Sequence, residues 1–143
     1  MSSDYEIVMD ALFAQLIGGG DFVTTGRRVM HWGQVSEQPA LFLRRTGVLY
    51  QSQDLQVMRT LVCEAWIYSK AGEDPDAAPD EALTDLEAKV LARLAPDVHD
   101  DDEARFTLGG LVYWCRVEGR SDMGPGDQAG QAVMKIPILV TLP

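Results

Sequence analysis

His31 and His99 are the only histidines that a catalytic site in this chain could use as a base. A nucleophilic site needs a nucleophile, a base and a group that orients the base. Neither histidine lies in a known catalytic signature, and the sequence has no G-x-S-x-G elbow and no phosphate-binding glycine loop. The three glycines at residues 18–20 follow a predicted helix rather than a strand, so they do not fit a dinucleotide-binding turn. The residues therefore favour a chain that is not an enzyme.

Carboxylates and thiols are the other candidate ligands. Residues 99–103 (HDDDE) could bind a hard cation through their carboxylates. The run lacks the spacing and the turning glycine of a calcium loop, and dense acidic runs are more typical of solvated loops. Cys63 and Cys115 fall in predicted strands, where a disulfide is possible, but two buried thiols in a reducing compartment fit better. We expect no metal site and no cofactor.

The negative charge of the chain is concentrated in two runs. The chain has 12 basic and 22 acidic residues, a net charge of −10. Five acids lie in residues 73–81 (EDPDAAPDE) and five in residues 97–103, and neither run contains Lys or Arg. The rest of the chain is neutral, and its arginine pairs at 27–28 and 44–45 do not form a basic patch. Nucleic-acid grooves and anionic membranes both require concentrated basic charge, so the sequence disfavours both kinds of binding.

Length and composition indicate one globular domain. A chain of 143 residues, 46% of them apolar, fits a single domain over residues 1–143. No apolar stretch is long enough to span a membrane. The first ten residues, MSSDYEIVMD, lack the basic and then apolar pattern of a secretory signal, so we expect synthesis in the cytoplasm.

Two helices are predicted from apolar residues at spacings of three and four. The first covers residues 4–17, begins with a Ser3–Glu6 capping box and ends at the glycines of residues 18–20. The second runs from about residue 79 to residue 94. The apolar face of the first helix consists of Tyr5, Val8, Met9, Leu12, Phe13, Leu16 and Ile17, and that of the second consists of Leu83, Leu86, Val90, Leu91 and Leu94.

The remaining segments are predicted strands. The strand at 57–70 has apolar residues on both faces, which is typical of a central strand covered on both sides for part of its length. Because strands do not alternate regularly with helices, the order favours an α+β fold: a mainly antiparallel sheet with two helices packed on it. The other predicted strands lie at 22–25, at 40–44 and 48–53 with a turn at Thr46-Gly47, and at 106–108, 111–118 and 129–142.

The last predicted strand carries the clearest sign of an assembly surface. Pro137 cannot donate a hydrogen bond to a neighbouring strand, so this strand is expected at a sheet edge or at a bulge. Met134, Ile136, Ile138 and Val140 form one apolar row on it. An uncovered edge with such a row is a hazard for a monomer. We therefore expect another subunit to cover part of the row, and a closed ring is one symmetric outcome.

Three segments, in the expected order, resemble tail-terminator proteins of long-tailed bacteriophages and prophages. The first is RRVMHW…QPALF, residues 27–42, and the second is LGGLVYWCRVEG, residues 108–119. The third is GD…GQAVMKIPI, residues 126–138. We assign six residues to a subunit or tail interface: Arg27, Arg28, Trp32, Met134, Ile136 and Ile138.

The resemblance implies a structural virion protein with a small α+β fold. Such proteins form a hexameric ring at the head-proximal end of the tail tube, stop the addition of tube protein, and present the surface that the head-completion protein joins. No catalysis and no cofactor are expected, and DNA would only pass through the lumen. The implied location is the virion tail, after synthesis in a bacterial host.

Three other functions stay open on the sequence. A head-completion or connector protein is the nearest, because it would also be a small virion component. A small ligand-binding α+β module of non-viral origin would be a stable monomer or dimer in solution. A hydrolase would depend on His31 or His99 with nearby carboxylates, and replacing both histidines by alanine would abolish its activity.

Overall fold

Two long strands, β2 (Ala40–Gln53) and β3 (Gln56–Lys70), form the centre of the fold. The computed structural model describes residues 4–31, 34–35, 37–70, 80–100, 102–124 and 131–143. Its main sheet has the order β1-β2-β3-β8-β6, and β7 pairs with the same edge of β8 as β6 does. Among the described strands of this sheet, only β1 and β2 pair in parallel, so the sheet is mainly antiparallel, as predicted. The other strands of the main sheet are β1 (Thr24–Gly26), β6 (Trp114–Val117), β7 (Asp122–Gly124) and β8 (Gln131–Thr141). A separate hairpin consists of β4 (Val98–Asp100) and β5 (Glu103–Arg105).

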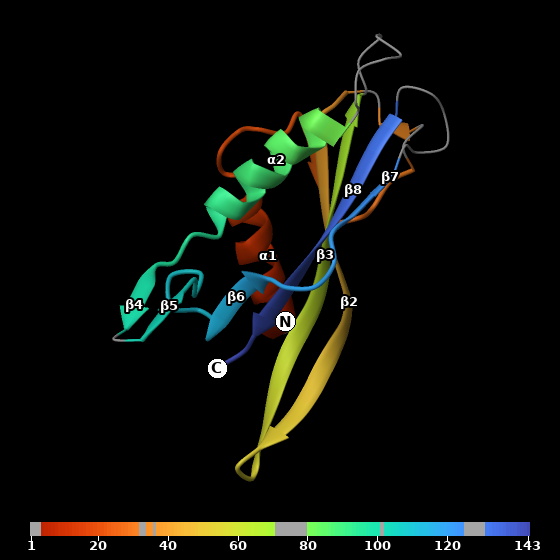
Figure 1. Cartoon of the computed structure of the whole chain (residues 1–143). Helices are drawn as coiled ribbons and strands as arrows, with labels where there is room; N and C mark the ends of the chain where they lie inside the picture. The colour runs from red at the N-terminus through yellow and green to blue at the C-terminus, as the bar shows by residue number, and fades with distance from the viewer. Residues whose placement is uncertain (1–3, 32–33, 36, 71–79, 101, 125–130) are drawn as a thin grey trace.

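Two helices, α1 (Asp4–Ile17) and α2 (Asp80–Arg93), cover one face of this sheet (Figure 1). Both lie close to their predicted bounds, because the apolar spacing is a local signal. Arg93 Nε donates to the carbonyl of Gln15 at 2.8 Å, and Gln15 Nε2 donates to the carbonyl of Arg93 at 2.6 Å, which joins the ends of the two helices. One predicted face residue, Leu91, is instead 45% exposed, because it lies beside the buried stripe rather than on it.

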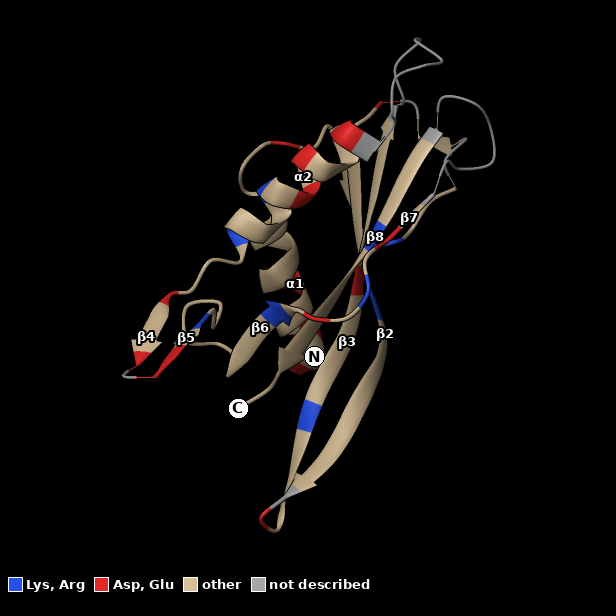
Figure 2. Cartoon of the chain, in the orientation of Figure 1, with Lys and Arg blue, Asp and Glu red and all other residues tan. Residues whose placement is uncertain are grey.

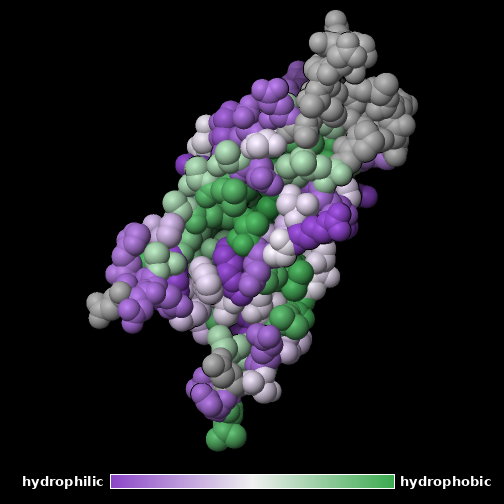
Figure 3. Space-filling view, viewed as in Figure 1, coloured by the Kyte–Doolittle hydropathy of each residue, from purple (hydrophilic) through white to green (hydrophobic). Residues whose placement is uncertain are grey.

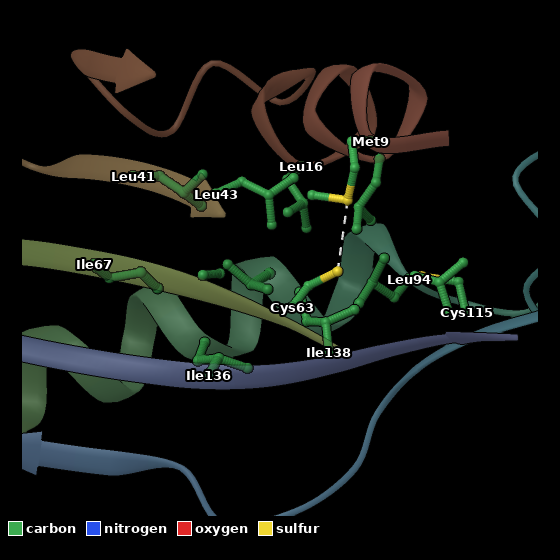
Figure 4. Packing of buried hydrophobic residues seen from close by; sticks show 14 of the residues in the cluster. Met9, Leu16, Leu41, Leu43, Cys63, Ile67, Leu94, Cys115, Ile136 and Ile138 are labelled. Carbon is green, nitrogen blue, oxygen red and sulfur yellow. Dashed lines mark hydrogen bonds between the residues drawn. The ribbon is translucent and has the colours of Figure 1, made fainter. Parts of the chain in front are cut away.

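The core lies between the helices and the sheet (Figure 4). Cys63 on β3 and Met9 on α1 meet there, with the thiol donating to the methionine sulfur at 3.6 Å. Both cysteines are buried and free, as predicted, and burial raises the pKa of each to about 12. A second, smaller cluster on the opposite face holds Phe42 and Tyr68, so β3 is covered on both sides at one end. The prediction of a central strand with two partly covered faces is confirmed.

A bulge replaces the turn that was predicted at Thr46-Gly47. The pairing of β2 with β3 shifts by one residue between Arg45 and Gly47, and the strand continues to Gln53. The chain reverses instead at Asp54 and Leu55. The extra residue changes which side chains face the helices, so that Val48 packs against the core where strict alternation would have placed Gly47. The separate strands predicted at 40–44 and 48–53 are therefore one strand.

The last strand is not a sheet edge, so that prediction was wrong. β8 pairs with β3 along one side and with β6 and β7 along the other. Pro137 fits there because it lies between the residues that pair with β6 and those that pair with β7. The apolar row of β8 faces the helices and is buried in the core of the chain, with Met134, Ile136, Ile138 and Val140 each at most 1% exposed.

The segment from 97 to 113 also differs from its prediction. Part of the acidic run 97–103, expected to be a loop, forms the β4–β5 hairpin. Residues 106–108 and 111–113, expected to be strands, are not part of any strand. Asp97 organises this segment, because its carboxylate accepts hydrogen bonds from Thr107 N and Oγ1 at 2.7 and 2.9 Å and from Gly109 N at 2.9 Å. Leu108, Gly109 and Gly110 all have positive φ, which needs this fixed anchor.

Candidate assembly interface

The β2–β3 hairpin extends beyond the rest of the sheet (Figure 1). β3 pairs with β8 only from Thr60 onward, and β2 pairs with β1 only through Ala40, Leu41 and Phe42. Residues 49–58, which we call the arm, therefore form a ribbon to which no other described strand pairs. At about 3.4 Å per residue, the tip at residue 55 reaches about 14 Å beyond Arg59. An isolated two-stranded ribbon is marginally stable, so the arm is suited to packing against another surface.

The arm exposes apolar side chains on both of its faces. Tyr50 is 63% exposed and Val57 64%, and the register places both on the side that faces the helices. Leu49, 45% exposed, lies on the other side. Leu55 at the tip is fully exposed, and Figure 3 shows the apolar surface of the tip at the lower end of the molecule. Apolar side chains gathered on a projecting element are typical of an interface with another protein.

The turn at the tip has a residue type that is unusual for its backbone conformation. Asp54 has φ 48° and Leu55 has φ 69°, so both residues occupy the left-handed region. Turns of this kind favour Asn-Gly or Asp-Gly, and a leucine in that conformation costs about 1–2 kcal/mol. Leu55 recovers none of this cost by packing within the chain, since it is fully exposed. Because Leu55 breaks a local rule without a gain inside the chain, it is a candidate for contact with another molecule.

A hollow lies at the base of the arm. It has a volume of about 300 Å³, between the start of α1, β3 and the end of the chain. Ile7, 48% exposed, and Leu111, 37% exposed, supply apolar surface. Its lining residues are Asp4, Ile7, Val8, Arg59, Leu111, Leu142 and Pro143.

Arg59 supplies the positive charge of this hollow. Its Nη1 donates to the hydroxyl of Tyr5 at 3.3 Å, and its guanidinium lies 5.4 Å from the centre of the Tyr5 ring. In Figure 2, basic colour appears on β3 near the base of the arm and acidic colour at the turn. The tip of the arm thus carries an acidic residue, and the hollow is lined by both Arg59 and Asp4.

The open face of the sheet carries a polar cluster that is satisfied within the chain. Arg44 donates to Glu64 through Nε at 2.9 Å and Nη2 at 2.8 Å, and Trp66 Nε1 donates to the same carboxylate at 3.2 Å. Lys135 lies 5.0 Å from the Trp66 ring centre. Burial alone would raise the pKa of Glu64, but the hydrogen bonds from Arg44 and Trp66 outweigh it and hold that pKa below its usual value. This cluster stabilises the sheet and needs no ligand.

The acidic β4–β5 hairpin does not assemble a metal site from its described residues. His99, Asp100, Asp102 and Glu103 line a shallow hollow there, and Arg105 pairs with Asp100 at 3.0 Å and with Glu103 at 3.7 Å. Within the described ranges, no three His, Cys, Asp or Glu side chains are grouped so that they could hold a metal ion. Asp101 and residues 71–79, which include most of the first acidic run, lie outside the described residues.

The predicted interface residues have different positions. Arg27 pairs with Asp10 at 2.9 Å and Glu6 at 3.8 Å, so it ties the segment after β1 to α1. Arg28 is exposed, and Trp32, like Ser3 of the predicted capping box, lies outside the described residues. Met134, Ile136 and Ile138 were assigned to an interface on the premise of an uncovered edge, and this assignment is corrected: they fill the core.

The sequence offered one overlooked signal of the arm. Asp54 interrupts the strand pattern, and Leu55 beside it is an apolar residue at a turn position, where polar residues and glycine are typical. Thr46-Gly47 obscures this signal, because in the sequence these two residues themselves resemble the turn of the hairpin.

Comparisons with known proteins agree with the fold. No known protein-family model matches this chain. No curated protein matches it in sequence either. Its structure is similar to a chain in a solved structure described as the virion of a native gene transfer agent (GTA) particle, with a TM-score of 0.51 and 14% sequence identity. The similarity covers 98% of this chain and 91% of that chain, so the two share their α+β fold over nearly their whole lengths.

Proposed function

We propose that this chain is a structural component of a phage-like virion, acting as the tail terminator at the head-proximal end of the tail tube. One observation carries the proposal: the fold matches a chain of a gene transfer agent virion along nearly the full length of both chains. The three sequence segments that resemble tail terminators support the same role. Under this proposal the chain functions by assembly and carries out no catalytic step.

The arm supports a role in assembly. It offers an extended ribbon with apolar side chains on both faces, and such a ribbon is suited to lying between two neighbouring proteins. The proposed partners are further copies of this chain in a hexameric ring, the tail tube protein on one side and the head-completion protein on the other. DNA would pass through the ring without being held. No helix among the described residues is long and apolar enough to cross a membrane.

Electron microscopy of particles from the producing strain tests this proposal. The gene for this chain is disrupted, and the lengths of the tails are measured with and without a plasmid copy of the gene. A terminator predicts overlong tails without heads, reversed by the plasmid. Full heads beside separate tails of normal length would assign the chain to head completion instead. Intact particles of normal infectivity would reject a virion role.

A further inference from the structure

We infer that the tip of the arm binds a second copy of this chain, with Leu55 inserted into the hollow lined by Ile7, Leu111 and Leu142. The contact is head-to-tail: the arm of one copy meets the hollow of the next. This inference deepens the proposed function and rests on it for the closed ring, since head-to-tail contacts give rings when the rotation closes.

The tip and the hollow match in polarity and size. Leu55 is fully exposed at the end of the ribbon, and the hollow presents the half-exposed side chains of Ile7 and Leu111. Its volume of about 300 Å³ is at the lower limit for small-molecule pockets, and is enough for an aliphatic side chain with part of its turn. An apolar side chain in such a pocket, excluded from water, is typical of the residues that dominate protein interfaces.

The charges next to these two surfaces are complementary. Asp54 precedes Leu55 and has no ion-pair partner in the part of the chain that the structure describes. Arg59 lines the hollow and contacts Tyr5, and no carboxylate lies within ion-pair distance of it among those same residues. Asp4 also lines the hollow, and Arg59 is the basic residue of the lining with which an incoming acid would pair. Insertion of Leu55 would bring Asp54 towards the Arg59 of the second copy.

The arm cannot fill the hollow of its own chain. Arg59 lies at the base of the same ribbon whose tip is Leu55, about 14 Å away along an extended strand. The two surfaces therefore point to a second copy as the occupant. This occupant also explains why the turn retains a leucine in a left-handed conformation, because the side chain is buried only after assembly.

Site-specific cross-linking tests the contact. One chain carries Leu55→Cys, and a tagged second chain carries Leu111→Cys. The native Cys63 and Cys115 are buried and do not compete. A short thiol cross-linker should join the two chains, both in concentrated purified protein and in assembled particles. The matched control replaces Leu111→Cys by Met123→Cys, an exposed apolar position on β7, and should give no product.

Leu55→Gly separates binding from folding. Glycine suits the left-handed turn, so the variant should unfold at the same temperature as the native chain or a higher one. Its self-association, measured by sedimentation, should weaken about tenfold or more, because the buried leucine is lost. Asp54→Arg or Arg59→Asp alone should also weaken it, and the double variant should recover most of the loss.

The outcomes distinguish this inference from the proposed function. Absence of the Leu55–Leu111 cross-link from both purified protein and particles would overturn the inference. If the cross-link were absent but disruption of the gene still gave overlong tails without heads, the terminator role would remain supported and only the arm-to-hollow contact would be rejected. A specific cross-link combined with normal particles after disruption would support the contact and reject the role.

Discussion

At the residue scale, Asp97 shows how one side chain can organise a segment without a strand. Burial alone would raise its pKa, but the hydrogen bonds from Gly109 and Thr107 outweigh this effect and hold the pKa of Asp97 below its usual value. A carboxyl whose pKa is lower in the folded state stabilises the protein above its unfolded pKa of about 4, and loses that contribution as the pH falls through the folded pKa.

Asp97→Ala should therefore destabilise the chain in a pH-dependent way. We expect a loss of about 1 kcal/mol at pH 7, at the low end for bonds to a charged acceptor because the carboxylate is exposed and water screens it. The difference between native chain and variant should shrink below about pH 4. Urea unfolding at a series of pH values measures this, with Asp85→Ala on α2 as the control for net charge. A difference that stays constant with pH would contradict the account.

Ile136 tests the corrected position of the β8 row. Ile136→Ala should lower the free energy of unfolding of the single chain by about 2–5 kcal/mol, because the side chain is 1% exposed and leaves a cavity. Thermal unfolding of the dilute chain measures this loss. Val23→Ala, at an apolar position that is 60% exposed, is the control and should change little. An unchanged free energy of unfolding for Ile136→Ala would contradict the buried position of this residue.

At the scale of elements, the bulge at Thr46 decides how the arm is presented. The inserted residue places Tyr50 on the helix side of the ribbon and Leu49 on the open side. If Thr46 paired regularly with Val62 instead, every side chain from there to the turn would lie on the opposite side. The Thr46 hydroxyl also donates to the carbonyl of Val62 at 3.2 Å, which fixes the position of the bulge.

Insertion of one alanine between Gly47 and Val48 should therefore destabilise the chain by about 1–3 kcal/mol, because Val48 would leave the core face. Thr46→Ala keeps the residue count and should cost about 1 kcal/mol or less for the lost hydrogen bond. Chemical denaturation compares the two variants. If both lost the same stability, the register shift would not be the cause.

The elements that the sequence predicted correctly are those defined by local signals. Each helix carries its own apolar spacing and its own end signals, so α1 and α2 were found without knowledge of their neighbours. The strand at 57–70 was found as central because both of its faces are apolar. The bulge was missed because Thr46-Gly47 resembles a turn when the partner strand is unknown. The position of β8 was missed because its neighbours, β6 and β7, are short and non-local.

The candidate site could not be predicted for the same reason. Exposure of Leu49 and Val57 depends on where β8 stops pairing with β3, and no residue in the arm encodes this end point. The hollow joins the start of α1, β3 and the end of the chain, which are distant in sequence. Predicting it would have required the correct topology first.

At the scale of the whole molecule, charge is the property that a ring would multiply. One copy carries −10, so a ring of six would carry −60. If an acidic run lined the lumen, it would repel passing DNA and reduce its adhesion. Replacing the acids of 97–103 other than Asp97 by lysine should then slow DNA ejection from assembled particles several-fold. Ejection at the native rate, from this variant and from one reversed at 73–81, would contradict this part of the account.

We propose that copies of this chain form a ring at the head-proximal end of a tail, joined arm to hollow. A reconstruction by electron microscopy of the junction between head and tail, in particles from the producing strain, tests it most directly. We expect a ring between the tube and the head into which six copies of this fold can be placed, with Leu55 of each copy against Leu111 of the next. A junction whose density does not fit this fold, or copies found only elsewhere in the particle, would contradict the claim.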